Sequence, residues 1–177
     1  MIAPPRGPPA ARPSNRYTPA EGMKLTQSGN GSVHQLFCAL DYMAAFIQGK
    51  GLTYAVIGGM ARTLRGSRRE THDVDIAVAC DMDTLRKAFN GEQRVKVPIG
   101  PPSGVMRVFV EVGPAHGDNV SEQWIQVDLF LAGFFRVPKD LTGNTEIVPV
   151  LTSAEPEKCK EFNVLCTESD KKDESTA

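Results

Sequence analysis

Two stretches of the chain repeat apolar residues every three or four positions. The first predicts a helix from residue 33 to 48, which stops before Gly51. The second predicts a helix from residue 82 to 89, with Asp81 in position to cap its first turn. Each helix has one apolar face, so we expect both to pack on a sheet.

Shorter stretches either alternate apolar and polar residues or are continuously apolar, and they predict strands. A short helix at residues 60–64 follows the strand expected at residues 53–57. Strands and helices in this order predict an α/β fold with a mixed, twisted sheet of about five strands and helices mainly on one face. The expected strands are 53–57, 73–79, 94–97, 105–112 and 124–131, with a short one at 147–151.

The two ends of the chain lack these patterns. Residues 1–31 are rich in proline with scattered glycine and serine, which predicts a disordered tail; a ligand for a proline-binding module is the alternative. Residues 152–177 read as a polar tail that is partly helical or disordered, with some helical character at 155–166. The expected domain therefore spans residues 32–151.

Composition narrows the functional classes. Lys and Arg total 20 against 21 for Asp and Glu, so no overall basic field attracts a long nucleic acid, which disfavours a processive polymerase. The four cysteines show no C-x-x-C spacing, so we expect no zinc site and a cytoplasmic or otherwise intracellular location. No run of 18 apolar residues exists, so no membrane span is expected.

Asp73 and Asp75 lie two positions apart on an expected strand, so they share one face while Val74 and Ile76 share the other. Two adjacent carboxylates repel each other and ionise with difficulty unless a counter-charge is present. Magnesium ions can supply that charge, and two ions about 4 Å apart can activate a hydroxyl and stabilise a leaving pyrophosphate. The alternative is a solvated pair at a strand edge.

The glycines and arginines around this strand suggest a phosphate site. Gly58 and Gly59 follow an apolar strand directly, which allows close approach of a ligand to the backbone. Arg65, Arg68 and Arg69 are close enough in sequence to add charged contacts to phosphates. A plain turn and a solvated basic surface are the respective alternatives.

Asp128 interrupts an otherwise apolar strand. Ile125 and Val127 alternate onto one face, which leaves Asp128 on the other with Gln126 and Phe130. A buried aspartate is costly unless it is paired or binds a metal. It is a candidate third metal ligand if its strand lies beside the one carrying Asp73; a neighbouring turn or an arginine could satisfy it instead.

Together, Gly58-Gly59, the run Arg69-x-Thr71-x-Asp73-Val74-Asp75 and the distant Asp128 resemble the nucleotidyltransferase fold of the DNA polymerase beta superfamily, in particular its small, stand-alone, toxin-like members. The resemblance covers roughly residues 32–151. It implies that Asp73 and Asp75 bind both metal ions, that Asp128 binds the catalytic one and that the glycine pair holds phosphate.

The resemblance implies an enzyme that transfers a nucleoside monophosphate from an NTP to an acceptor and releases pyrophosphate. The acceptor stays open among protein, an RNA end and a small molecule. Little chain follows the third carboxylate strand, whereas many relatives have a helical region there. A partner chain could complete the site, the chain could be a fragment, or activity could be impaired. A nucleotide-binding module without turnover and an interaction protein built on the proline-rich tail are the alternatives.

Overall fold

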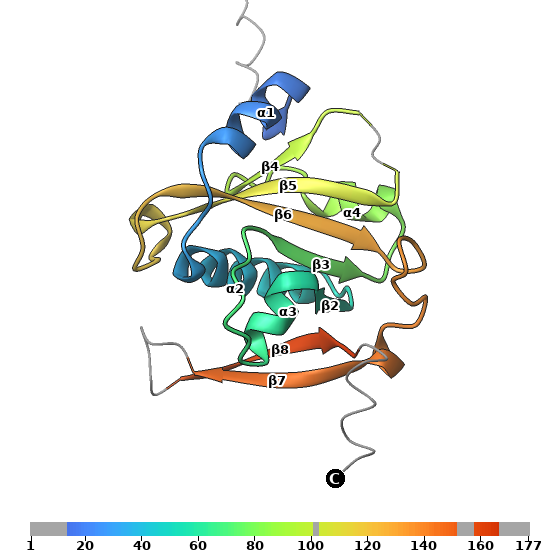
Figure 1. Ribbon diagram of the computed structural model, residues 1–177. Helices are drawn as coiled ribbons and strands as arrows, with labels where there is room; N and C mark the ends of the chain where they lie inside the picture. Colours follow the sequence, from blue (N-terminus) through green and yellow to red (C-terminus); the bar gives the residue numbers. More distant parts are fainter. Residues whose placement is uncertain (1–13, 101–102, 152–157, 167–177) are drawn as a thin grey trace, which may run out of the picture.

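The computed structural model describes residues 14–100, 103–151 and 158–166, and these form a mixed α/β fold around one eight-stranded sheet. The strands follow the order β1-β4-β5-β6-β3-β2-β8-β7, and Figure 1 shows them from β4 and β5 near the top to β7 at the bottom. The elements are β1 (Arg16–Tyr17), α1 (Pro19–Gln27), α2 (Val33–Gly49), β2 (Tyr54–Ile57), α3 (Gly58–Leu64), β3 (Val74–Val78), α4 (Met82–Ala88), β4 (Val95–Pro98), β5 (Val105–Val112), β6 (Gln123–Leu131), β7 (Thr145–Leu151) and β8 (Cys159–Leu165), with 3-10 turns at Pro114–His116 and Thr142–Asn144.

The predicted α/β class is confirmed, but the expected count of about five strands is wrong. The sheet is mixed, because β3 runs parallel to β6 and antiparallel to β2. The additional strands are β1 and β8, near the two ends of the chain. Their apolar residues are few and lie among charged ones, so the sequence pattern that predicts a strand is weak there. The central strands β6 and β3 are the two that carry the aspartates near or within them.

Three helices share one face of the sheet, as expected. Leu36 of α2, Met60 of α3 and Leu85 of α4 are completely buried in one apolar cluster with the inward-facing strand residues. The opposite face has a smaller cluster, in which Val137 and Leu141 pack against alanines of β2 and β3. No helix in the described part of the chain is long and apolar enough to cross a membrane.

The expected disorder of residues 1–31 is wrong for the segment that the structure describes, which contains β1 and α1. Thr18 caps α1 with a reciprocal bond to Glu21, and Pro19 occupies the first turn, where a missing N–H costs little. The ring of Tyr17 packs edge-on against Phe109 with centroids 5.3 Å apart. This segment is therefore docked on the sheet; residues 1–13 lie outside the described residues.

The helical character expected at 155–166 is also wrong where the structure describes it. Residues Cys159–Leu165 form β8, which pairs antiparallel with β7 along its whole length. Phe162 and Val164 alternate into the core with 2% and 0% exposure. The period of two decides the structure, because it buries both apolar side chains on one face of a strand.

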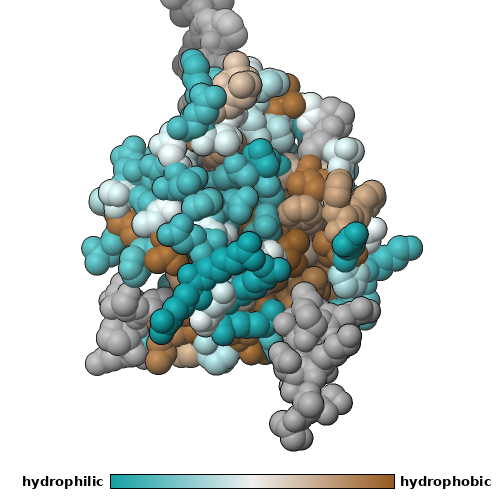
Figure 2. All heavy atoms as spheres, viewed as in Figure 1, coloured by the Kyte–Doolittle hydropathy of each residue, from teal (hydrophilic) through white to brown (hydrophobic). Residues whose placement is uncertain are grey.

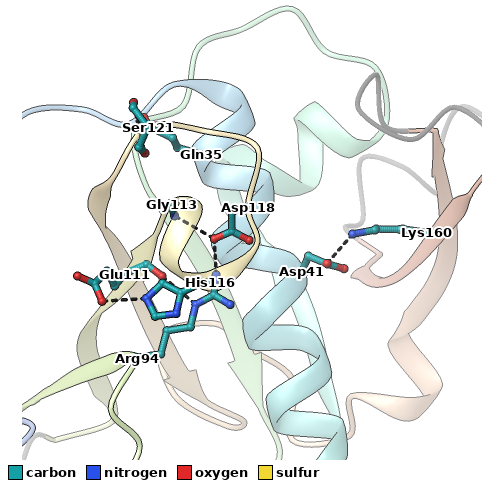
Figure 3. Close-up of polar contacts among 9 residues, drawn as sticks. All are labelled: Gln35, Asp41, Arg94, Glu111, Gly113, His116, Asp118, Ser121 and Lys160. Carbon is teal, nitrogen blue, oxygen red and sulfur yellow. Dashed lines mark hydrogen bonds and ion pairs between the residues drawn. The ribbon is translucent and has the colours of Figure 1, made fainter.

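Polar contacts attach the connection between β5 and β6 to its surroundings, as Figure 3 shows. An oxygen of Asp118 accepts a bond from Nη2 of Arg94 at 2.5 Å and from the backbone N–H of Gly113 at 3.0 Å. Nearby, Nζ of Lys160 on β8 lies 2.5 Å from Oδ2 of Asp41 on α2. These contacts bind the loop and the β7–β8 hairpin to the rest of the fold.

Candidate active site

The parallel pairing of β3 and β6 brings the three predicted aspartates together. Asp75 is the direct partner of Asp128 in the register of the two strands. Asp73 precedes β3 by one residue and lies two positions before Asp75. One carboxylate oxygen from each residue lies within 4.8 Å of the others, which confirms the predicted cluster. Their role as metal ligands stays a prediction.

The electrostatics of the cluster centre on Asp75. Burial, and after it the charges of Asp73 and Asp128, raise the pKa of Asp75 to about 7, and the Arg107 guanidinium partly opposes this shift. Burial disfavours the charged form of the carboxyl group, and the two neighbouring carboxylates disfavour it further. The expected repulsion within the cluster is therefore present at Asp75.

Arg107 is a residue of this site that the sequence did not identify. It lies on β5 directly opposite Asp128 in the antiparallel register of β5 and β6. Its Nε is 2.8 Å from Oδ1 and its Nη2 is 3.0 Å from Oδ2 of Asp128, which forms a two-pronged ion pair. The Gln126 amide lies beside the same pair. The sequence had left an arginine open as a partner of Asp128, and Arg107 is that partner.

The glycine pair lies directly against the carboxylates. Gly58 follows β2 with φ of +65°, and a Cβ atom there would overlap with Oδ2 of Asp75. A Cβ at Gly59 would overlap with the hydroxyl of Thr71. Gly58 is favoured both by its positive φ and by this contact, whereas a side chain at Gly59 would have to displace Thr71. The glycine pair is therefore packed against Asp75 and Thr71, and phosphate binding stays a prediction.

The three predicted arginines differ in position. Arg65 donates from Nε to Glu146 at 2.8 Å and from Nη2 to the carbonyl of Leu165 at 2.9 Å, so it attaches the end of α3 to the β7–β8 hairpin. Arg68 and Arg69 are exposed in the connection that leads to Asp73. The structural contacts of Arg65 were not predicted. A contact between phosphate and any of the three stays a prediction.

The segment from α1 to Gly31 lies beside the carboxylates. A cavity of about 90 Å³ is enclosed by residues 25–31 on one side and by Asp73 and Gln126 on the other. A wider groove of about 420 Å³ runs between α1 and the side chains of Arg107 and Phe109. The wrongly predicted tail thus forms part of the surroundings of the site.

The surface is unevenly polar. Figure 2 shows hydrophilic side chains gathered on the left of the view and hydrophobic ones on the right. Among the large apolar side chains that are exposed, Phe134 and Phe135 follow β6 closely and are 52% and 64% exposed. Phe135 has a φ of 48°, which a non-glycine residue rarely adopts, and its ring packs on Phe130, with centroids 6.1 Å apart.

Comparison with solved structures identifies the fold. The chain superposes on an antigenic nucleotidyltransferase-like protein from Paracoccidioides brasiliensis with a TM-score of 0.54 and 16% identity, over 77% of this chain and 63% of that one. The chain has a nucleotidyltransferase fold. It thus spans less than two thirds of that relative's length, and at this identity the likeness concerns the fold alone.

Two further solved structures with weaker similarity have nucleotidyltransferase descriptions. A provisionally assigned nucleotidyltransferase from Thermotoga maritima has a TM-score of 0.47 and 18% identity, over 82% of this chain and 86% of that one. The lincomycin-bound lincosamide adenylyltransferase LnuA has a TM-score of 0.44 and 15% identity, over 82% of this chain and 95% of that one. No family model and no curated protein matches the sequence.

Proposed function

We propose that this protein transfers a nucleoside monophosphate from an NTP to an acceptor, with release of pyrophosphate, and that the reaction depends on two magnesium ions. The observation that carries the proposal is the group of three carboxylates within 4.8 Å of one another on adjoining strands of a nucleotidyltransferase fold. Such a donor set suits a hard divalent cation, since magnesium prefers carboxylate oxygens and shares its coordination shell with phosphates.

The three aspartates would have different roles in metal binding. Asp73 and Asp75 would bind both metal ions, and Asp128 would bind the ion next to the attacking group. The charges of Asp73 and Asp128 contribute, after burial, to the raised pKa of Asp75, and a cation bound among the three carboxylates would relieve this repulsion. Bound magnesium would supply Lewis-acid activation of the attacking oxygen and neutralise charge on the phosphates.

The glycine pair would receive the triphosphate. At Gly58 and Gly59 the backbone comes close to Asp75 and Thr71, so a phosphate bound there would lie next to the carboxylates. Arg68 and Arg69 are exposed and available for charged contacts to the outer phosphates. In the proposed reaction the acceptor oxygen bonds to the α-phosphorus and the bond from that phosphorus to the bridging oxygen breaks. Pyrophosphate leaves, and the acceptor's proton passes to a carboxylate of the cluster.

The acceptor is a protein side chain, an RNA end or a small molecule. A partner chain that contacts the base of the nucleotide remains part of the proposal. The chain spans 63% of the Paracoccidioides brasiliensis structure.

A pyrophosphate-release assay tests the proposal. Each of the four NTPs is incubated with the full chain and magnesium, in the presence of total RNA, protein extract or small-molecule alcohols as acceptors. α-Labelled NTP then shows which fraction becomes modified. We expect release that EDTA and Asp73→Asn both abolish. Absence of release with every NTP and acceptor class, together with absence of magnesium-dependent NTP binding, would contradict the proposal.

A second candidate function is nucleotide binding without turnover. The specific observation in its favour is that both oxygens of Asp128 are already engaged by Arg107. For this candidate, calorimetry should detect an NTP that binds with magnesium, while no acceptor supports release of pyrophosphate.

A further inference from the structure

Arg107, Asp128 and Asp75 form a row across three neighbouring strands. Asp128 is the register partner of Asp75 on one side and of Arg107 on the other. On a sheet, directly paired residues point to the same face, so the guanidinium and the two carboxylates share one surface. The row therefore places a fixed cation next to the carboxylate that the proposed reaction needs.

The contact is a preorganised one. The pair is two-pronged, with N–O distances of 2.8 and 3.0 Å, and Asp128 is only 7% exposed. The backbone of Arg107 is itself held, because its carbonyl accepts a bond from the hydroxyl of the buried Tyr17 at 2.7 Å. A planar guanidinium that meets both carboxylate oxygens fixes the plane of the carboxylate as well as its place.

A carboxylate in such a pair keeps the capacity to bind a metal ion. Two oxygens offer about four lone-pair positions, and the two N–H donors of Arg107 use one on each oxygen. The Gln126 amide, 3.3 Å from Oδ2, takes at most one more, so acceptor positions remain on Asp128. Asp73 and Asp75 each offer a ligand oxygen within 4.8 Å of one from Asp128.

We propose that Arg107 is a positioning residue that orients Asp128 toward Asp73 and Asp75 and thereby sets the metal affinity of the cluster. The inference rests on the proposed function, because it assumes that the three carboxylates bind a divalent cation. Arg107 itself touches neither metal nor nucleotide in this proposal. It acts through Asp128, as outer-shell partners of ligating carboxylates do.

Arg107 could instead have the opposite effect and lower the metal affinity of the cluster. A cation beside three carboxylates also repels an incoming metal ion, so removal of Arg107 could strengthen metal binding. Orientation predicts weaker binding without Arg107, and competition predicts tighter binding. The sign of the change in affinity decides between them.

The test is a Mn²⁺ titration of the full chain followed by electron paramagnetic resonance, which measures metal affinity without turnover. The variants are Arg107→Gln, Arg107→Lys and, as a matched control, Arg94→Gln, which breaks the other arginine–carboxylate pair at Asp118. We expect Arg107→Gln to weaken Mn²⁺ binding by about 10- to 100-fold. Lysine should restore part of the affinity, since it keeps one donor and loses the fork. Arg94→Gln should bind Mn²⁺ like the unmodified protein.

Several outcomes overturn the inference, and they are distinguishable from failure of the proposed function. Equal or tighter binding by Arg107→Gln, in a protein whose circular dichroism spectrum is unchanged, removes the positioning role. An equal loss in Arg94→Gln shows that the effect is general instability. If Arg107→Gln does not fold, equal or tighter binding by Arg107→Lys has the same meaning. If the unmodified protein binds no Mn²⁺, both the inference and the proposed function fail.

Discussion

The protein contains two arginine–carboxylate pairs that look alike locally and differ in what surrounds them. Arg94 and Asp118 tie the β5–β6 connection to the adjoining strand, with both side chains 15% exposed (Figure 3). Arg107 and Asp128 join β5 to β6, with side chains 48% and 10% exposed. Asp118 also accepts the N–H of Gly113, and Arg94 also donates to a backbone carbonyl. The polar groups of the first pair are therefore bonded within the loop and its adjoining strands.

The second pair is not self-contained. Asp128 shares its face with Asp73 and Asp75, and the three form the one group of potential metal ligands among the described His, Cys, Asp and Glu residues. A buried ion pair by itself is weak support for either stability or function. Three carboxylates that converge beside a single arginine are stronger support for function, and their repulsion contributes, after burial, to the raised pKa of Asp75. The pair at Asp128 belongs to the candidate site, and the pair at Asp118 stabilises the loop between β5 and β6.

The largest expected effect separates the two regions by activity. Asp73→Asn and Asp75→Asn should each reduce magnesium-supported nucleotide transfer by at least about 100-fold, because each removes a carboxylate that would hold the magnesium ions, and those ions would stabilise the negative charge that develops in the reaction. Asp118→Asn should leave transfer unchanged at a temperature where the variant is folded. Pyrophosphate release measures all three. Equal losses in the three variants would contradict the distinction between the two regions.

A pH dependence of stability should sharpen the same contrast. Because the pKa of Asp75 is raised to about 7, the folded state binds more protons than the unfolded state from about pH 4 to pH 7. The contribution of Asp75 to stability is therefore present at low pH and lost as pH rises through 7, by about 2–4 kcal/mol at 1.36 kcal/mol per pKa unit. Asn at this position mimics the protonated carboxyl group. Urea unfolding in EDTA at pH 5 and 8 should show this loss in the unmodified protein and a smaller one in Asp75→Asn; identical pH dependence would contradict it.

The sequence predicted the aspartate cluster because its signals are local. Alternation alone assigns Asp73 and Asp75 to one face and Asp128 to the polar face of its strand. Arg107 could not be assigned in this way. Its meeting with Asp128 depends on the register of β5 against β6, which are joined by a ten-residue connection from 113 to 122 that contains a 3-10 turn. Register across such a connection is not encoded in a short turn motif.

The ends of the chain were misread for a different reason. Prolines and charges dominate their composition, and composition favours disorder. The capping box of Thr18 and Glu21 with Pro19 between them was nevertheless readable as a helix start. In β8, the alternation of Phe162 and Val164 is typical of a strand, but it comprises only two buried residues and is a weak signal. Helix α1 and strand β8 are both stabilised by packing against the rest of the fold, and the local sequence alone does not predict that packing.

Tyr17 offers the next test, because its hydroxyl donates to the backbone carbonyl of Arg107, which is paired with Asp128. Tyr17→Ala removes a side chain that is 8% exposed, an edge contact with Phe109 and a hydrogen bond to the carbonyl of Arg107. We expect unfolding free energy to fall by about 2–4 kcal/mol, somewhat less than for aromatic residues in a full core. Tyr17→Phe should cost only about 1 kcal/mol. Thermal melts check both, and an unchanged melting temperature in Tyr17→Ala would show that this segment does not dock.

The smallest expected effect lies in the pair at Asp118. Asp118→Asn keeps the shape of the side chain but removes the charge that holds Arg94, so we expect a loss of about 1–3 kcal/mol in the free energy of unfolding. The amide oxygen can still accept the N–H of Gly113, which keeps the loss at the lower end of that range. Because Asp118 belongs to the loop and not to the carboxylate cluster, Mn²⁺ affinity should stay within twofold of the unmodified value, about 0.4 kcal/mol. Chemical denaturation measures the first quantity and paramagnetic titration the second. A tenfold change in metal affinity with no loss of stability would reverse the roles of the two pairs.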